Sequence, residues 1–249
     1  MRVEVEAAPS VFTLDTERCA LLVIDMQNDF GAAGGMFARA GIDIAPIRAV
    51  VAPIAQVGAA ARRAKLPVVY LQMGYGPDLA ELGPPGSPNR ERHLAFGVGD
   101  DTVAPGGLPS RVLVRDTWNT AIVGELAPEP GDLAIWKTRF SGFYATDLDA
   151  TLRSCGVSQL IVTGCTTSVC VESTIRDAMF RDYACLLLAD CCAEPVGANL
   201  PRTNHEASLL VTQALFGWVT SSTALLGALG AGGRAPAEAA SLVQNHGGG

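Results

Sequence analysis

Three reactive side chains lie where apolar runs of this sequence end. Asp25 directly follows the run at 20–24, and Lys137 directly follows the run at 133–136. Cys170 comes a short turn after a third apolar run and opens the next predicted helix. In an open parallel sheet, ligands bind outside the carboxyl ends of the strands, so these side chains can meet in one pocket. A carboxylate, an ammonium and a thiol supply a base, a cation and a nucleophile, which are sufficient for acyl transfer.

The position of Cys170 distinguishes it among the seven cysteines of the chain. The turn at 164–169 joins a strand to a helix, and Cys170 falls in the first turn of that helix. Free backbone N–H groups and the positive end of the helix dipole stabilise a thiolate there, and the same N–H groups can hold an oxyanion. A buried core thiol is the alternative, because free cysteine also packs as a small apolar residue.

Asp25 and Lys137 each have a functional and a structural interpretation. Asp25 can accept the thiol proton, since none of the three histidines is placed for that role, or it can cap the loop after its strand. Lys137 and Lys65 are the only lysines among 18 basic residues. A lysine that ends an apolar strand needs a charged partner, and between Asp25 and Cys170 it would lower the pKa of the thiol. A solvated surface cation is the alternative.

Strands alternate with helices along most of the chain, which predicts a parallel sheet covered by helices on both faces. The predicted strands lie at 19–25, 66–71, 132–137, 159–164, 184–189 and 217–220. The predicted helices lie at 45–64, 119–127, 147–155, 169–182 and 201–215. One α/β domain accounts for this pattern.

Three segments fall outside the regular pattern. Residues 1–18 are expected to form an extended N-terminal arm in front of a hydrolase domain at 19–229. The end of the chain, 230–249, is rich in Gly and Ala and is expected to be flexible. The loop at about 73–110 is longer than ordinary connections, so we expect it to be functional or to act as a lid.

The bulk composition narrows the class of partner. The net charge is −7 and no basic run occurs, so nucleic acid is not an expected partner. No apolar stretch approaches the roughly 20 residues of a membrane span, and the amino terminus lacks the pattern of a signal peptide. Charged residues make up 17% of the chain, which favours a homo-oligomer, a dimer or tetramer, with buried subunit contacts.

The cysteines and histidines argue against disulfides and metal. Seven cysteines are an odd number and form no Cys-x-x-Cys pair, so we expect reduced thiols and a cytoplasmic location. The three histidines form no metal-binding pattern. We therefore expect neither a metal nor a cofactor, and a small molecule as the partner.

Three motifs carry a family resemblance: VIDMQNDF at 23–30, KTRFS at 137–141 and GCTTSVCVEST at 164–174. They resemble the isochorismatase-like cysteine hydrolases, a family that includes nicotinamidases, N-carbamoylsarcosine amidohydrolases, biuret hydrolases and ureidoacrylate amidohydrolases. The resemblance spans about residues 11–228. It implies a single-domain Rossmann-like fold, with three layers (α/β/α) and a mainly parallel six-stranded sheet.

The resemblance also implies a catalytic triad of Asp25, Lys137 and Cys170. A cis peptide between Cys165 and Thr166 would turn the N–H groups of Thr166 and Cys170 into an oxyanion hole. Asp25 would take the thiol proton, and Cys170 would attack an amide carbonyl and release ammonia or an amine. Water would then hydrolyse the thioester.

Two features of the resemblance bear on the reaction. Isochorismatases of this fold cleave a vinyl ether without a thiol, so a cysteine in the nucleophile position favours amide chemistry. Some nicotinamidases bind a metal through an Asp and two His, and the segment after Asp25 contains no His. No metal is therefore implied.

Within the family, the likeness extends to ureidoacrylate amidohydrolases and biuret hydrolases, as at 86–89 and 216–219. That group tends to carry Tyr where Phe30 and Phe140 stand, and Asn-Gly-Trp at 73–75. Loss of polar groups weakens recognition of a small ureido acid. A small amide or ureido compound is the predicted substrate, with a bulkier amide or lactam on the same triad as the alternative.

Seven side chains are predicted to bind substrate: Phe30, Met73, Tyr75, Trp118, Phe140, Phe143 and Gln213. Gln213 resembles a glutamine that biuret-type enzymes use, and a solvated helix position is equally open. Trp118 and Phe143 have a core position as their alternative. Two other functions stay open at this point, an ether hydrolase and a non-catalytic binding protein of the same fold.

Overall fold

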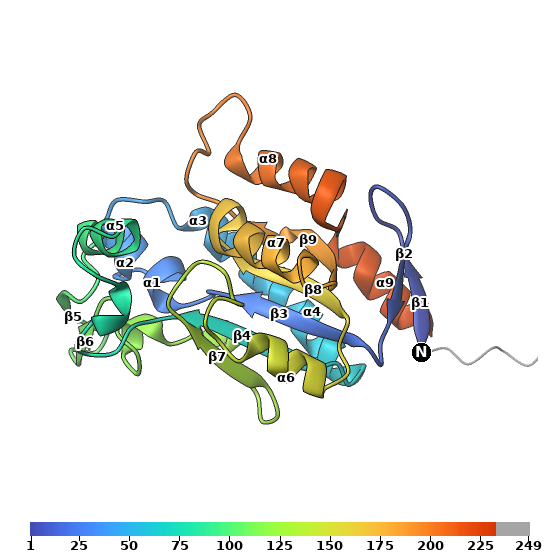
Figure 1. Ribbon diagram of the computed structural model, residues 1–249, viewed down its shortest axis with the longest axis horizontal. Helices are drawn as coiled ribbons and strands as arrows, with labels where there is room; N and C mark the ends of the chain where they lie inside the picture. Colours follow the sequence, from blue (N-terminus) through green and yellow to red (C-terminus); the bar gives the residue numbers. More distant parts are fainter. Residues whose placement is uncertain (233–249) are drawn as a thin grey trace, which may run out of the picture.

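The computed structural model describes residues 1–232, and its centre is a parallel sheet of six strands in the order β10–β9–β8–β3–β4–β7 (Figure 1). The strands are β3 (Cys19–Ile24), β4 (Val68–Met73), β7 (Leu133–Lys137), β8 (Gln159–Cys165), β9 (Ala184–Ala193) and β10 (Trp218–Thr220). All five neighbouring pairs run parallel. The predicted α/β fold with a six-stranded parallel sheet is confirmed.

The strand order places a crevice beside β3. Numbered along the chain, the sheet strands read 3-2-1-4-5-6, the doubly wound order, and the order reverses between β3 and β8. Connections that leave these two strands go to opposite faces of the sheet and leave space at their carboxyl ends. Asp25 and Cys165 stand at these ends, so the predicted site falls at the switch point.

Helices cover both faces of the sheet. Alternate residues of β3 face opposite sides, and both sides belong to buried apolar clusters. The helices α4 (Val51–Arg63) and α9 (Ser222–Gly232) pack on one face, and α6 (Leu148–Ser154) and α7 (Glu172–Met179) pack on the other. Because β3 is buried on both faces, its sequence is a continuous apolar run rather than an alternating one.

Two of the predicted helices are broken. The helix expected at 45–64 is divided into α3 (Ala45–Ala49) and α4. Pro53 explains the break, because it has no N–H and its ring clashes with the carbonyl of Ala49, four residues earlier. The segment expected as a helix at 119–127 forms two 3₁₀ turns, η2 (Trp118–Thr120) and η3 (Gly124–Leu126).

Two others contain a π-turn. The segment expected at 169–182 begins with the turn η4 (Thr167–Val171) and continues as α7. The segment expected at 201–215 consists of α8 (Asn204–Val211) and the turn η5 (Thr212–Phe216). Single π-turns within helices occur frequently at functional sites.

The N-terminal segment is more structured than an extended arm. Residues 1–18 contain β1 (Arg2–Val5) and β2 (Phe12–Asp15), which pair antiparallel and pack against α9. Phe12 and Leu14 are buried there. Of the tail expected at 230–249, residues 230–232 belong to α9, and 233–249 lie outside the described residues.

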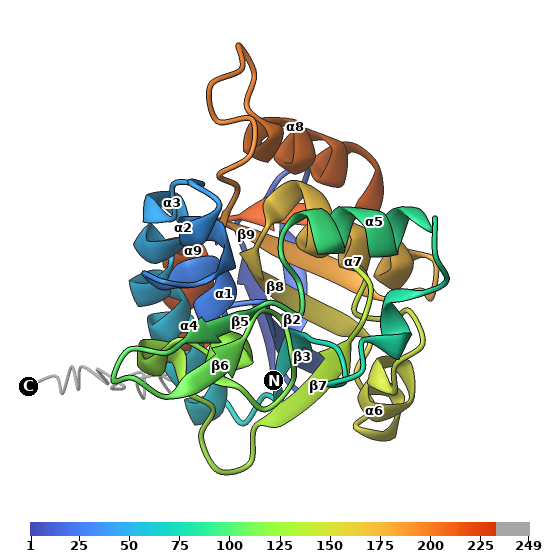
Figure 2. The same cartoon turned by 90° about the vertical axis from the view of Figure 1, so that its left-hand side faces the viewer.

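The long segment after β4 folds over the carboxyl ends of the strands (Figure 2). It contains η1 (Ala80–Leu82), α5 (Pro88–Ala95) and β5 (Asp101–Val103), which pairs with β6 (Pro109–Arg111). Two short helices after β3, α1 (Asn28–Gly31) and α2 (Met36–Arg39), lie beside it. None of these elements was predicted, although Ser87 caps α5 and Pro88 occupies its first turn, which are standard start signals.

The helices are short. The 13-residue α4 spans about 20 Å, against roughly 30 Å of bilayer hydrocarbon. Within residues 1–232, no helix has the length and apolarity to cross a membrane.

Gly164 permits the close approach of β8 to β3. A Cβ at this position would lie 2.1 Å from the Ile24 carbonyl oxygen, and its φ is +119°. We expect Gly164→Ala to lower the free energy of unfolding in urea by about 3 kcal/mol or more. Gly156→Ala is the matched control, since φ is +69° there and no atom lies within 4 Å. It should cost only about 1–2 kcal/mol, and equal losses in the two variants would contradict the steric explanation.

Candidate active site

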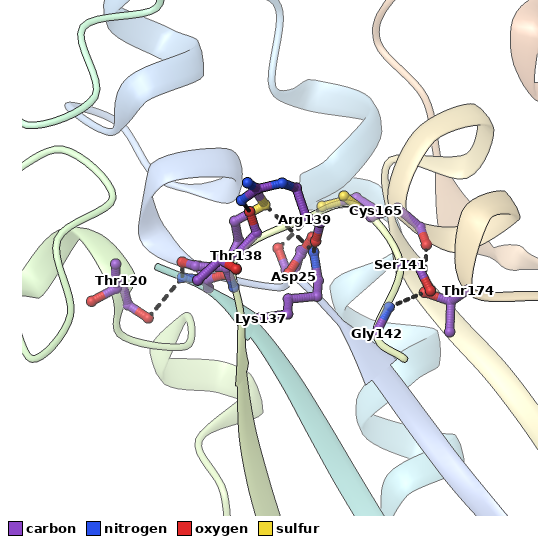
Figure 3. A network of polar contacts seen from close by, with 12 residues as sticks. Asp25, Thr120, Lys137, Thr138, Arg139, Ser141, Gly142, Cys165 and Thr174 are labelled. Carbon is purple, nitrogen blue, oxygen red and sulfur yellow. Dashed lines mark hydrogen bonds and ion pairs between the residues drawn. The ribbon is translucent and has the colours of Figure 1, made fainter. Parts of the chain in front are cut away.

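A buried ion pair joins the ends of two strands. Asp25 follows β3, Lys137 ends β7, and their Nζ–Oδ2 distance is 2.7 Å with both side chains at most 1% exposed. Figure 3 shows the two side chains pointing toward one another. The Asp25 backbone has φ +53°, a left-handed conformation that turns the chain sharply after the strand. The structure thus brings together two of the three predicted catalytic residues.

The surroundings of the pair keep Lys137 charged. Burial alone would lower the pKa of the Lys137 ammonium, but the neighbouring Asp25 carboxylate and Cys170 sulfur outweigh that effect, and the pKa is raised. The ammonium also contacts the Arg139 carbonyl at 3.3 Å and the Met73 sulfur at 3.5 Å. Burial raises the pKa of the Asp25 carboxyl, and Lys137 opposes that shift.

The Asp25 carboxylate can accept further hydrogen bonds. Apart from the ion pair with Lys137, neither oxygen accepts a well-aligned hydrogen bond within residues 1–232. Buried polar atoms without a partner are rare and need an explanation. The cavity beside Asp25 supplies an explanation, because the Asp25 oxygens can accept a hydrogen bond from a substrate or a thiol there.

Cys170 lies in the turn η4 and faces the same cavity. Its thiol is near enough to Asp25 and Lys137 to influence the pKa of each. Burial raises the pKa of the Cys170 thiol well above its ordinary value, Asp25 adds to the increase and Lys137 opposes it. The predicted lowering of the thiol pKa by Lys137 is present, but the effect of burial outweighs it.

The turn in front of Cys170 presents backbone donors. The peptide bond between Cys165 and Thr166 is cis. Within the described residues, the Thr166 N–H donates to no protein acceptor. The Cys165 thiol donates to the Asp25 carbonyl oxygen at 3.2 Å, and the Thr174 hydroxyl donates to the Cys170 carbonyl at 2.7 Å. Both ends of the turn are thereby tied down.

Two polar residues that were not predicted fix the backbone around the site. The buried Gln27 amide donates to the carbonyls of Met73 and Thr120, and its oxygen accepts from the Met73 N–H at 2.7 Å. Asp29 accepts hydrogen bonds from the N–H groups of Met36 and Leu113. Burial raises the pKa of Asp29 to about 6. Their sequence signal was a run of polar residues directly after a buried strand.

A cavity of about 180 Å³ opens beside the triad. Of the predicted substrate-binding residues, Phe30, Met73 and Phe140 line it, together with Asp25, Cys165, Thr166 and Cys170. Elements that the sequence analysis missed supply much of the remaining wall, with Met36 and Phe37 from α2, and Arg92, His93 and Phe96 from the α5 region. The long loop after β4 therefore contributes directly to the pocket.

Four predicted substrate-binding residues lie outside the cavity wall. The Tyr75 hydroxyl is turned away and donates to the Thr138 carbonyl. Trp118 lies against the loop at Gly34. Phe143 packs in the core against Tyr183, with ring centroids 5.7 Å apart.

Gln213 is the fourth residue, and its position in the sheet explains its absence from the wall. It lies on η5, which directly precedes the edge strand β10 in the sequence. The strands β3 and β7, which lead to Asp25 and Lys137, are further along the sheet. The predictions of Trp118 and Phe143 rested on aromatic type near strand ends, which does not determine the direction of a side chain in irregular backbone. Those of Tyr75 and Gln213 rested on the family resemblance.

The described part of the chain gathers no group of three or more His, Cys, Asp or Glu that could hold a metal. His205 bonds the Thr167 hydroxyl at 2.9 Å, and His93 bonds the Asn89 carbonyl. These two histidines thus each have a local partner. That the protein uses neither metal nor cofactor stays a prediction.

Comparisons with known proteins identify the family. The model of the isochorismatase domain matches residues 19–224. Ureidoacrylate amidohydrolase RutB of Methylobacterium radiotolerans is 41% identical over 94% of this chain and 88% of the relative. The protein of the same name from Variovorax paradoxus is 39% identical over 86% of this chain and 82% of the relative. The chain belongs to the isochorismatase family, as its motifs predicted.

Solved structures share the fold. A cysteine hydrolase from Pseudomonas syringae pv. phaseolicola superimposes with a TM-score of 0.74 at 27% identity, covering 92% of this chain and 97% of that one. N-carbamoylsarcosine amidase from Thermoplasma acidophilum gives a TM-score of 0.61 at 25% identity, covering 82% of this chain and 96% of that one.

The ion pair generates a prediction about pH and stability. Lys137→Met leaves the Asp25 carboxylate buried without its counter-charge, so the folded-state pKa of Asp25, already raised, rises further. An acid with a raised folded-state pKa stabilises the fold at low pH and loses that contribution as pH rises. We expect urea unfolding to show a loss of about 3–5 kcal/mol at pH 8 and a smaller loss at pH 5.

The control for that prediction is the double variant Asp25→Asn/Lys137→Met. Since it removes both charges, most of the lost stability should return and the difference between pH 5 and pH 8 should disappear. A loss in Lys137→Met that is the same at both pH values would show that Asp25 is not the group responsible.

Proposed function

We propose that the protein is a cysteine amidohydrolase that cleaves a C–N bond in a small amide or ureido compound. The observation that carries this proposal is the buried Asp25–Lys137 pair at the switch point, with the Cys170 thiol beside both groups. A base, a fixed cation and a nucleophile in one closed cavity provide the groups that thiol-dependent acyl transfer requires.

The first half of the reaction forms a thioester. Asp25 takes the proton from the Cys170 thiol as the sulfur attacks the carbonyl carbon. Since burial raises the pKa of both groups, the proton moves at the moment of attack rather than before it. The N–H groups of Thr166 and Cys170 hold the oxyanion. The C–N bond then breaks, and Asp25 returns the proton to the departing nitrogen.

The second half releases the enzyme. Asp25, again a carboxylate, takes a proton from water, whose oxygen attacks the thioester carbon. The C–S bond breaks, and the proton returns to the Cys170 sulfur. Lys137 keeps its positive charge throughout and holds the carboxylate in place at 2.7 Å. The sum is one amide and one water converted to an acid and ammonia or an amine.

The relatives suggest the group that is cleaved. The names ureidoacrylate amidohydrolase and N-carbamoylsarcosine amidase both denote substrates with a terminal carbamoyl group. We extend that group, –CO–NH₂, to the substrate of this protein. Its small size agrees with a cavity of about 180 Å³ in which Phe30, Met73 and Phe140 form part of the wall.

The test of this function is product release from a panel. Ammonia is measured for ureidoacrylate, biuret, N-carbamoylsarcosine, nicotinamide and maleamate, and the ring-opened amino acid is measured for a cyclic lactam. We expect turnover of at least one carbamoyl compound, and a fall of at least about 10³-fold in Cys170→Ala. Cys155→Ala is the matched control, because Cys155 is exposed and outside the cavity, and it should keep full activity. Thermal unfolding verifies that both variants fold. Full activity in Cys170→Ala would refute the mechanism.

We also propose a homo-oligomer, a dimer or tetramer, in the cytoplasm. Large apolar side chains are exposed on α8, on η5 and directly after α7, namely Leu210 at 48%, Leu215 at 67% and Phe180 at 66%. All seven cysteines are free, which suits a reducing compartment. Light scattering should give at least twice the 25.9 kDa mass of one chain. A monomer at micromolar concentration, or a secreted pool on cell fractionation, would contradict this assignment.

A further inference from the structure

The cavity wall facing the triad is largely apolar. Phe30 and Phe37 come from the segment after β3, while Phe96 and Phe140 come from the α5 region and the chain after β7. Burying a charged group against such a wall costs far more than burying an apolar one. The part of a substrate that extends away from Cys170 must pack against these rings.

The cations around the cavity are already paired or solvated, so they would bind a substrate carboxylate weakly. Lys137 is paired with Asp25 at 2.7 Å. The guanidinium of Arg139 donates to the carbonyls of Glu81 and Thr138. Arg92 lines the cavity but is exposed, so its charge is solvated at the rim. Among the residues that line the cavity, no buried cation remains for an acidic substrate.

His93 is the one neutral polar side chain on the α5 side of the cavity. It is 7% exposed, and its ring lies against Tyr75 and Phe140, with centroids 5.6 Å and 5.7 Å away. Its Nδ1 lies 2.6 Å from the Asn89 carbonyl oxygen. A carbonyl oxygen can only accept, so Nδ1 carries the proton. The other nitrogen, Nε2, is then a hydrogen-bond acceptor in the neutral ring.

The surroundings of His93 keep the ring neutral and leave Nε2 available. Burial lowers the pKa of His93, the Asn89 carbonyl opposes that shift, and the positive charges of Lys137 and Arg139 add to it. Within residues 1–232, Nε2 has no hydrogen-bond partner, and the protein does not fully enclose it. Since His93 lines the cavity, Nε2 is the ring nitrogen left free to bond a molecule bound there.

We propose that the substrate is a ureido compound R–NH–CO–NH₂ in which R is apolar and uncharged, and that His93 Nε2 accepts a hydrogen bond from the inner N–H. This inference rests on the proposed amidohydrolase function and adds the substrate class to it. R packs against the phenylalanine rings, while the terminal carbamoyl group reaches Cys170. His93 is thereby a specificity-determining residue.

The first arm of the test compares charge. The substrates are phenylurea, n-butylurea and 3-ureidopropionate, where the last two have similar length and differ in one carboxylate. We expect kcat/KM to be at least about 10-fold higher for n-butylurea than for 3-ureidopropionate. Higher activity on the acid, lost in Arg92→Gln, would overturn the inference and leave the amidohydrolase function standing. Absence of product from every compound, in this set and in the earlier panel, would refute the function and the inference together.

The second arm tests His93. Phenylacetamide replaces the inner N–H of phenylurea with CH₂, so it keeps the ring and the terminal amide. In His93→Phe, we expect kcat/KM for phenylurea to fall about 10-fold, mainly through KM, and that for phenylacetamide to change less than about 2-fold. Leu94→Phe, at an exposed neighbouring position outside the cavity wall, is the control for an added ring on α5 and should leave both unchanged. Equal losses on the two substrates would refute the proposed hydrogen bond.

Discussion

The buried ion pair between Asp25 and Lys137 is the interaction on which the rest of the site depends. Both side chains are almost completely removed from water, at 1% and 0% exposure. Desolvation of two charges is unfavourable unless the geometry is close and the surrounding groups are fixed. A buried pair is therefore weak support for stability. Its presence is better understood as a functional constraint that the fold satisfies at some cost.

The sheet provides the rigidity that such a pair needs. Asp25 and Lys137 extend from strands separated only by β4, so their positions are fixed by two parallel ladders of backbone hydrogen bonds. Gln27 adds a clamp at the same edge, because one amide bonds the backbone of β4 at Met73 and the carbonyl of Thr120. Chemistry carried on strand ends is positioned more accurately than chemistry carried on loops.

The sequence predicted the chemical centre well and its surroundings poorly, for a physical reason. Asp25, Lys137 and the start of the Cys170 helix follow buried strands, and the apolar pattern of a parallel sheet places the residues that follow it. Tyr75 and Phe143 lie in connecting segments, and the wall residue His93 lies on the short helix α5 within the long segment after β4. There the direction of each side chain depends on tertiary contacts, such as the Tyr75 bond to Thr138, which no local periodicity encodes.

The reactive groups and the groups that would contact the rest of the substrate come from different parts of the fold. The strand ends and the turn η4 carry the charges and the thiol, whereas α2 and the long segment after β4 carry aromatic rings and one neutral imidazole. An apolar covering strengthens the electrostatics beneath it, because the Asp25–Lys137 attraction grows as water is excluded. The same covering raises the pKa of the Cys170 thiol, and in the proposed mechanism Asp25 accepts its proton. On this proposal, the apolar segments that contact the substrate also raise the thiol pKa, and for that reason the nucleophile needs a neighbouring base.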